Sequence, residues 1–328
     1  MKTTIFDTHK FEKDILISEN NERHELRFLD VRLTAQTAAL AAGSQAVVIF
    51  VHDHADAEVL TSLAAVGVKF IALRCAGYNN VDVAAAKKLG LRTARVPEYS
   101  PHAVAEHALT LMLALNRKIY RAYNRVRELN FSLDGLVGFD LHGKTAGVIG
   151  TGRIGSCVAK ILNAFGCHVL AHDPVVNADL CQQQNVRYVT LAKLYAESDI
   201  ITLHMPLTAS TRYLIDTAAI NQMKKGVMLI NTSRGALLKT SDVISALKSG
   251  QIGYLGLDVY EEEDALFFED HSADILQDDC IARLITFPNV LITSHQGFLT
   301  SQALQNIAAT TFYNLDCFAK NQPTKNEL

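Results

Sequence analysis

Short apolar runs alternate with amphipathic stretches along the first hundred residues. The runs at 46–51, 69–73 and 92–96 have the length and composition of buried strands. Between them, apolar side chains recur at helical spacing over 57–66 and 83–89. Strands that alternate with helices usually pair in parallel, because each helix carries the chain back across the sheet. The pattern therefore predicts an α/β layer.

The alternation stops at residues 96–101 and resumes near residue 144. Proline is tolerated in the first turn of a helix, so Ser100 and Pro101 are expected to open a helix that runs to about residue 123. Further strands are predicted at 145–149, 168–171, 200–203, 227–231, 254–259 and 290–293, with helices that include 153–165, 218–223, 241–249 and 301–318. The polar tail at 320–328 has no apolar period and is expected to fray.

These elements predict an α/β protein of two Rossmann-like or flavodoxin-like domains, each a doubly wound parallel sheet, with a cleft between them. Residues 100–298 are expected to form one domain. Residues 1–99 together with 299–328 are expected to form the other, and the break at 96–101 is the candidate hinge. A length of 328 residues and a hydrophobic fraction of 49% agree with two cores.

The charge balance narrows the choice of partners. The chain carries 31 Lys and Arg against 34 Asp and Glu, a formal net charge of -3. This balance gives no electrostatic attraction to nucleic acid or to an anionic membrane. The first residues lack the apolar core of a secretion signal, and the most apolar helical stretch, 103–115, is too short to span a bilayer. We expect a cytoplasmic protein with neither a nucleic-acid nor a membrane partner.

Metal-ligand patterns are weak in this sequence. The six cysteines occur singly, without a CxxC pair, and are expected to be reduced. His52 and His54 share one face of a predicted strand end but have no third ligand at a recognised spacing. His102 and His107 are five residues apart, so they do not share a helix face as in an HExxH motif, and we expect both at the surface. We predict no bound metal.

A glycine-rich turn follows the predicted strand at 145–149. Gly150 makes the tight turn, Gly152 lets the backbone approach a pyrophosphate, and Gly155 lets the next helix lie close to the strand. The pyrophosphate would bind the free N–H groups at the start of that helix. Asp173 follows the next strand, where a carboxylate accepts the adenosine ribose hydroxyls and repels a 2′-phosphate. The unit predicts NAD as the cofactor.

Three further segments follow predicted strands and reach the edge of the sheet at which open α/β proteins bind ligands. They supply an arginine within 231–235, carboxylates within 258–263 and a histidine within 294–298. A dehydrogenase of 2-oxo acids needs a guanidinium to hold the substrate carboxylate and an acid to protonate the carbonyl oxygen as hydride arrives. A carboxylate beside that histidine would raise its pKa and fix its orientation.

The chain resembles the D-isomer-specific 2-hydroxyacid dehydrogenases, and among them the fermentative NAD-dependent D-lactate dehydrogenases, from about residue 69 to residue 315. The resemblance rests on six separated motifs, found at 74–82, 96–101, 104–107, 147–155, 231–236 and 256–261. It implies that Arg234 binds the substrate carboxylate, that His295 is the acid and base, and that Glu263 is the partner that raises the pKa of this histidine. The neighbouring acids at 261, 262 and 264 would be bystanders.

The resemblance also assigns residues to the substrate and the cofactor. The backbone amides of Ala76 and Gly77 would meet the substrate carboxylate, and Tyr99 and Phe298 would wall a small pocket. Gly297 departs from the alanine that close relatives often carry, which is expected to loosen the loop. The implied cofactor contacts are the backbone of Arg153 and Ile154, Asp173 on the ribose, His204, Met205 and Pro206 on the adenine side, and Thr232 and Asp258 at the nicotinamide end, with Ser233 among the cofactor-binding residues.

The expected reaction is the reduction of pyruvate by NADH to D-lactate, with residues 100–298 binding NAD and the discontinuous domain carrying the Ala76-Gly77 loop, which would close over Arg234. A dehydrogenase of larger 2-oxo acids is the alternative within the family, although aromatic Tyr99 and Phe298 favour a small substrate. An NAD-sensing corepressor-like binding module is the alternative from another class. Such modules are expected to add long disordered tails, whereas few residues follow the last predicted helix here. The resemblance also implies a homodimer or higher homo-oligomer, with 117–139 as a candidate arm.

Overall fold

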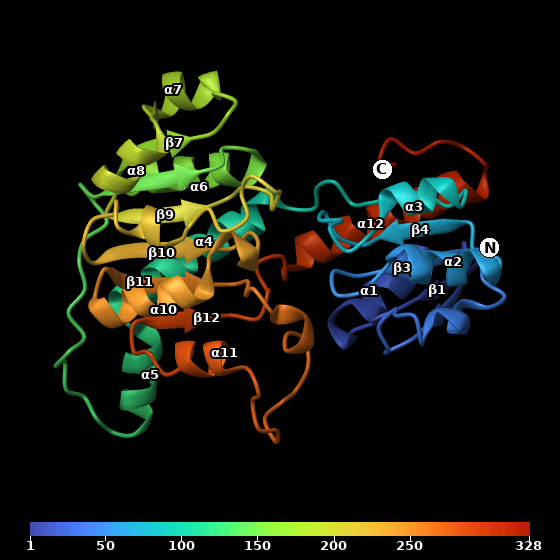
Figure 1. Cartoon of the computed structure of the whole chain (residues 1–328), viewed down its shortest axis with the longest axis horizontal. Helices are drawn as coiled ribbons and strands as arrows, with labels where there is room; N and C mark the ends of the chain where they lie inside the picture. Colours follow the sequence, from blue (N-terminus) through green and yellow to red (C-terminus); the bar gives the residue numbers. More distant parts are fainter. The chain divides into compact units, whose positions relative to one another are not determined.

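A computed structural model describes residues 1–328, except for the side chains of residues 183 and 184. The chain divides into two compact units, Met1–Ser100 with Leu299–Leu328 (unit 1) and Pro101–Phe298 (unit 2). In Figure 1, unit 1 comprises the blue to cyan segments and the red C-terminal helix. Each unit is a parallel sheet flanked by helices, so the predicted α/β fold class is confirmed. The assignment of a substrate role to residues 1–99 and 299–328 stays a prediction.

Unit 1 is built on a five-stranded parallel sheet with the strand order β2-β1-β3-β4-β5, the flavodoxin-like order. The strands are β1 (Lys2–Ile5), β2 (Glu25–Phe28), β3 (Ala46–Ile49), β4 (Phe70–Leu73) and β5 (Arg92–Ala94). The apolar pattern predicted β3, β4 and β5 but not the first two strands. Polar Thr3 and Thr4 fill the middle of β1, and β2 has no fully buried residue, so neither presents an apolar run.

Helices cover both faces of this sheet. They are α1 (Lys10–Asn20), the 3₁₀ helix η1 (Ala38–Ala41), α2 (Ala57–Ala65), α3 (Val83–Lys88) and α12 (Ser301–Ala319). On one face, Leu16 of α1 and Phe312 of α12 share a buried cluster with Phe70 of β4. On the other face, Leu60 of α2 and Ala86 of α3 belong to a second cluster. The last helix therefore completes the core of the first hundred residues.

The C-terminal tail is ordered, which corrects the expectation that it frays. Thr324 and Asn326 are buried, and the side chains of both donate hydrogen bonds to the side-chain oxygen Oδ1 of Asn314 on α12, at 2.8 and 2.9 Å. The backbone N–H of Arg95 donates to Asn326 O at 3.1 Å. Satisfied polar groups hold this segment in place although it has no apolar period.

Unit 2 contains a seven-stranded parallel sheet with the order β12-β11-β10-β9-β6-β7-β8. The strands are β6 (Thr145–Ile149), β7 (His168–His172), β8 (Arg187–Tyr188), β9 (Ile200–Leu203), β10 (Val227–Asn231), β11 (Ile252–Leu257) and β12 (Val290–Ile292). The order reverses between β6 and β9. This is the topological switch point, outside which doubly wound sheets bind their ligands.

The helices of unit 2 also form two layers. They are α4 (Pro101–Arg117), α5 (Ile119–Arg127), α6 (Arg153–Ala164), α7 (Ala178–Gln184), α8 (Leu191–Glu197), α9 (Thr217–Ile220), η2 (Gly235–Leu237), α10 (Thr240–Ser249), η3 (Glu263–Ala265) and α11 (Asp279–Leu284). Buried side chains of α4 and α6 pack on one face, and those of α8 to α11 pack on the other. None of the helices in the described structure combines the length and apolar composition needed to cross a membrane.

The first helix of unit 2 is shorter than predicted. It ends at Arg117 because Lys118 adopts a left-handed backbone conformation, with a φ of 49°. A separate helix, α5, follows and has no buried residue. The expected helix from 100 to about 123 is therefore two helices, and the break lies at a residue whose identity gives no local signal for it.

Candidate active site

The glycine turn after β6 depends on three glycines in three different ways. Gly150 has a φ of 89°, and a Cβ there would lie 2.5 Å from His204 O. A Cβ at Gly155 would lie 1.9 Å from Gly150 O, so α6 can approach the turn only without a side chain at this position. At Gly152, by contrast, the described chain places no heavy atom within 4 Å of a Cβ. The open side of the turn therefore lies at Gly152, the N-cap of α6.

This turn fits a dinucleotide. Gly152, the N-cap of α6, provides no side-chain capping hydrogen bond and leaves open space beside it, and the start of a helix is a favourable site for an anion. Asp173 follows β7 and accepts from Thr151 N at 2.7 Å and from Val175 N at 2.8 Å. Each carboxylate oxygen keeps a second lone pair. The predicted phosphate-binding turn and the predicted ribose-binding carboxylate therefore lie side by side.

His204 follows β9 and packs directly against this turn. Its Nε2 lies 2.8 Å from Thr202 Oγ1, while Nδ1 is buried and has no hydrogen-bond partner among the described residues. Burial lowers the pKa of the ring to about 3, which keeps it neutral near pH 7. The next residue, Met205, packs against the core, and Pro206 O accepts from Thr211 Oγ1 at 2.7 Å. The three residues assigned to the adenine side are thus contiguous with the glycine turn.

Arg234 lies in a rigid turn after β10. Ser233 Oγ donates to Leu203 O at 2.7 Å, and Asn231 Nδ2 donates to Arg234 O at 2.8 Å. Gly235 has no room for a side chain, since a Cβ would lie 2.0 Å from Tyr260 C. Arg234 itself is half-buried. The backbone that carries its guanidinium is therefore fixed by contacts with the two neighbouring strand ends.

Thr232, in the same turn, offers a second indication of a ligand. Thr232 is 8% exposed, and its Oγ1 atom is buried with no hydrogen-bond partner in the described chain. Buried hydroxyls normally have a partner, so a hydroxyl without one marks a place where a ligand or water belongs. The family resemblance implies that Thr232 lies at the nicotinamide end of the cofactor, and this unpartnered hydroxyl fits that expectation.

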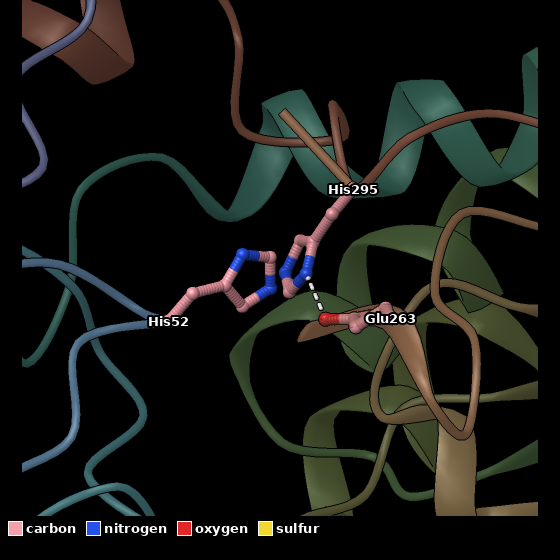
Figure 2. Close-up of side chains that lie close together, drawn as sticks. All are labelled: His52, Glu263 and His295. Carbon is pink, nitrogen blue, oxygen red and sulfur yellow. Dashed lines mark hydrogen bonds and ion pairs between the residues drawn. The ribbon is translucent and has the colours of Figure 1, made fainter. Parts of the chain in front are cut away.

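His295 and Glu263 are hydrogen-bonded to one another. Figure 2 shows the His295 ring turned toward the Glu263 carboxylate, with Nδ1 at 2.7 Å from Oε1. The other oxygen, Oε2, accepts from Tyr260 N at 2.8 Å. Because a carboxylate can only accept, the Nδ1 atom of His295 carries the proton of this hydrogen bond. The side chains are 17% and 13% exposed, so the pair is largely sheltered from water.

The other three acidic side chains of the 261–264 run have surroundings that differ from those of Glu263. Glu261 accepts hydrogen bonds from Tyr213 Oη and from Thr240 Oγ1, the latter at 2.8 Å. Glu262 and Asp264 are exposed. Glu263 is thus the carboxylate of this run that reaches His295.

Asp258 is buried beneath the loop that carries His295. Its Oδ1 accepts from Thr293 Oγ1 at 2.6 Å and from Gln296 N at 2.8 Å, and its Oδ2 accepts from Gly297 N at 2.8 Å. His107 Nε2 lies 3.1 Å from Oδ1. The expected surface position of His107 is therefore wrong, because its side chain is 13% exposed and faces Asp258. The one sequence signal that pointed to a place for His107 near the site is its position in the family motif at 104–107.

The residues assigned to the substrate are divided between the units. In unit 1, the Ala76-Gly77 loop follows β4, and Arg95 Nη1 donates to Ala76 O at 2.7 Å. Tyr99 also belongs to unit 1, where its carbonyl accepts from Asn306 Nδ2 at 2.6 Å. Phe298 is the last residue of unit 2 and is 8% exposed. Within unit 2, the Arg234 turn and the Glu263–His295 pair follow β10, β11 and β12, which are adjacent strands.

Comparison with known proteins places this geometry in a family. Residues 109–297 match the model of the D-isomer specific 2-hydroxyacid dehydrogenase NAD binding domain. The chain is 52% identical to D-lactate dehydrogenase of Escherichia coli over the whole of both chains. The apo structure of that bacterium's D-lactate dehydrogenase is similar with a TM-score of 0.91, covering 100% of both chains at 49% identity. A structure described as the pyruvate reductase of Chlamydomonas reinhardtii is similar with a TM-score of 0.94, at 46% identity over 99% of this chain and 98% of that one.

Proposed function

Since the chain belongs to the D-isomer-specific 2-hydroxyacid dehydrogenases, we propose that it reduces pyruvate to D-lactate with NADH. Its membership makes it an NAD-dependent oxidoreductase. The observation that carries the proposal is the 2.7 Å bond between His295 Nδ1 and Glu263, one strand away from the Arg234 turn. Relatives that share about half of its residues over their full length are named for D-lactate or pyruvate, which supports the smaller substrate.

The side chains of unit 2 supply the acid and the carboxylate site that this reaction needs. Arg234 would hold the substrate carboxylate with two parallel N–H donors. His295 would donate the Nε2 proton to the carbonyl oxygen of the 2-oxo acid, and Glu263 would stabilise the protonated ring through Nδ1. The bound nicotinamide would supply the hydride that C2 of the substrate accepts. In the reverse direction, the neutral His295 would take the proton of the hydroxyl group.

We propose that the cofactor lies along the carboxyl ends of β6, β7, β9, β10 and β11. Gly152, with the backbone of Arg153 and Ile154, would meet the pyrophosphate, and Asp173 would bind the adenosine ribose. Thr232 would use its unpartnered hydroxyl at the nicotinamide end. The orphaned Thr232 Oγ1 and His204 Nδ1 support a ligand along this edge.

The proposed substrate role of unit 1 rests on the resemblance. Ala76 and Gly77 would offer backbone amides to the carboxylate, and Tyr99 and Phe298 would limit the space around the substrate methyl group. Admitting a longer acid would require these aromatic side chains to move, at about 1–3 kcal/mol. We therefore expect 2-oxobutyrate to react with a kcat/KM about ten- to a hundredfold below that of pyruvate.

Steady-state NADH oxidation with a panel of 2-oxo acids tests this proposal. Pyruvate should be the best substrate, and the product should be oxidised by a D-lactate-specific enzyme but not by an L-lactate-specific one. Faster reduction of 2-oxoisocaproate than of pyruvate would assign the protein to larger acids. An absence of turnover with every 2-oxo acid, together with tight NADH binding, would instead favour an NAD-sensing binding module.

The variant Arg234→Gln tests the carboxylate site. It should lower kcat/KM for pyruvate by about 3 kcal/mol or more, because the substrate anion loses a bidentate partner in a sheltered site. The Kd for NADH should change little. Arg187→Gln is the matched control, since this arginine is exposed at the start of β8. Near wild-type pyruvate reduction by Arg234→Gln would remove the residue from the substrate site.

We also propose that the chain forms a homo-oligomer through residues 117–139. This segment exposes Leu129, Phe131, Leu133 and Val137, each by 69% or more. An apolar series of this kind on one segment is typical of an interface. Sedimentation of the double variant Phe131→Asp, Leu133→Asp should show monomers where the wild type associates.

The state of the cysteines bears on where the protein works. None of the six forms a disulfide in the described chain, which supports a reducing, cytoplasmic location.

A further inference from the structure

His107 lies on α4 and reaches the base of the loop that carries His295. Its Nε2 is 3.0 Å from Thr293 Oγ1 and 3.1 Å from Asp258 Oδ1. Thr293 and Asp258 follow β12 and β11, so these contacts connect the helix layer to two neighbouring strand ends. The side chain is 13% exposed and that of Asp258 is 2% exposed. The contacts are therefore sheltered from competing water.

The hydrogen-bond partners assign the donor in this cluster. The carboxylate of Asp258 can only accept, so His107 must carry its proton on Nε2 to bond with Oδ1. The Thr293 hydroxyl donates to the same oxygen at 2.6 Å, which leaves its own lone pairs to accept from Nε2–H. His107 thus donates to both groups at once, and no other side-chain donor besides the Thr293 hydroxyl reaches Asp258 among the hydrogen bonds of the described chain.

Asp258 in turn fixes the backbone of three consecutive residues. Its carbonyl accepts from His295 N at 2.6 Å, and its carboxylate accepts from Gln296 N and Gly297 N, each at 2.8 Å. His295 has a φ of 52°, in the left-handed region that residues other than glycine rarely occupy. Such a conformation persists only where surrounding contacts hold it. The three bonds to Asp258 are those contacts.

The lack of a side chain at Gly297 makes room for Asp258 and His107. A Cβ at position 297 would lie 2.9 Å from Asp258 Oδ2 and 3.5 Å from His107 Cδ2. The loop can therefore approach both side chains closely because residue 297 has no side chain of its own. The loop, the carboxylate and the imidazole are packed as one group.

We propose that His107 is a positioning residue, which orients Asp258 and thereby holds the loop so that His295 Nε2 faces the substrate carbonyl. The proposal rests on the acid and base role proposed for His295. His107 does not touch the substrate or the cofactor in this scheme. Removing its donor leaves the Asp258 carboxylate held by Thr293, Gln296 and Gly297 alone, so the carboxylate and the loop that it binds are held less firmly. A displacement of about 1 Å in a catalytic group can reduce turnover by about a hundredfold.

Three variants separate positioning from general stability. His107→Asn removes the donor, because the shorter amide does not reach Asp258. His107→Gln keeps an N–H donor near the position of Nε2. His102→Asn is the control, since His102 is exposed on the same helix. We measure kcat and KM for pyruvate, the Kd for NADH by fluorescence, and the isotope effect on kcat with NADH deuterated at the transferred position.

His107→Asn should lower kcat about ten- to a hundredfold, raise the deuterium isotope effect and leave the Kd for NADH within about twofold. His107→Gln should keep kcat within about threefold of the wild type, and His102→Asn should equal it. Thr293→Val removes the hydroxyl that Nε2 also contacts, and it should give an intermediate loss of kcat. It tests the same contacts if His107→Asn does not fold.

Two results would overturn the inference. One is wild-type kcat in His107→Asn or, if that variant does not fold, in Thr293→Val. The other is a kcat that falls only in proportion to the fraction of protein still able to bind NADH, with an unchanged isotope effect. Partial unfolding of the variant would produce this result. His295→Gln separates this failure from that of the proposed function. An inactive His295→Gln beside a fully active His107→Asn rejects the role of His107 alone, whereas an active His295→Gln rejects the proposed chemistry.

Discussion

Replacing Gly152 by alanine is expected to weaken NADH binding while leaving the folded protein about as stable as before. No heavy atom of the described chain lies within 4 Å of the new Cβ, so the methyl group meets no protein atom. Alanine reduces the conformational freedom of the unfolded chain, which stabilises by about 0.4–1 kcal/mol. It is a poorer N-cap than glycine, by about 0.5 kcal/mol. The two effects nearly cancel, and the free energy of unfolding should change by less than about 0.5 kcal/mol.

The same methyl group would occupy the space that the pyrophosphate is proposed to enter. Crowding of this kind costs about 1–3 kcal/mol, which corresponds to a Kd for NADH about 5- to 150-fold higher. The Kd is measured by fluorescence titration, and the free energy of unfolding by urea denaturation of the unliganded protein. At saturating NADH, kcat should change much less than the affinity, because the reacting groups are remote from this turn.

Gly155→Ala is the matched comparison, three residues away in the first turn of α6. Its Cβ would lie 1.9 Å from Gly150 O and 3.2 Å from His204 Cβ, so α6 must move away from the strand. This variant should lose about 1–3 kcal/mol of stability or more, in addition to weaker NADH binding. Wild-type affinity for NADH in Gly152→Ala would refute the placement of the pyrophosphate. Equal destabilisation by both variants would refute the description of Gly152 as open.

Three further predictions concern charges around the proposed site. The kcat/KM of the wild type should be about a hundredfold higher with NADH than with NADPH. Asp173→Ala should shrink that ratio, because NADH binds more weakly and NADPH more tightly without the carboxylate. Equal kcat/KM with both cofactors in the wild type would contradict the role of Asp173. Glu263→Gln removes the anion that stabilises the protonated His295 ring, so pyruvate reduction should fade at a lower pH than in the wild type, and overlapping pH profiles would exclude Glu263 from the mechanism. The pKa of His204 is lowered from 6.5 to about 3, so the unfolded chain binds a proton between these values that the folded protein does not. The wild type should therefore lose about 2 kcal/mol of unfolding free energy between pH 7 and pH 5 on account of this residue. Urea denaturation of His204→Gln at both pH values should show that much less acid sensitivity, and an unchanged pH dependence would contradict the buried neutral ring.

Several features of this protein are determined by contiguous sequence. The glycine turn and Asp173 lie within one strand, helix and strand unit. Inside that unit, Gly150 is required by its positive φ and Gly155 by the close approach to Gly150 O, whereas the contact of Gly150 with His204 comes from outside it. The alternation of apolar runs likewise predicted the parallel sheets, since the buried strands of such sheets are short and continuously apolar. The same pattern did not predict strands β1 and β2, because their stability comes from pairing with neighbouring strands rather than from an apolar run.

Other features depend on residues that only the fold brings together. Spacing could not choose among four neighbouring acids, and Glu263 stands apart because Tyr213 and Thr240 hold Glu261 elsewhere. The sequence placed His107 at the surface, since nothing within its helix shows that Asp258 and Thr293 lie against it. The order of the C-terminal tail is another case, because its polar groups are satisfied by Asn314 and by the end of β5. Local patterns record which residues are apolar and which backbone turns are allowed, whereas the partner of a buried polar group is fixed by segments distant in the chain, and only the tertiary structure decides it.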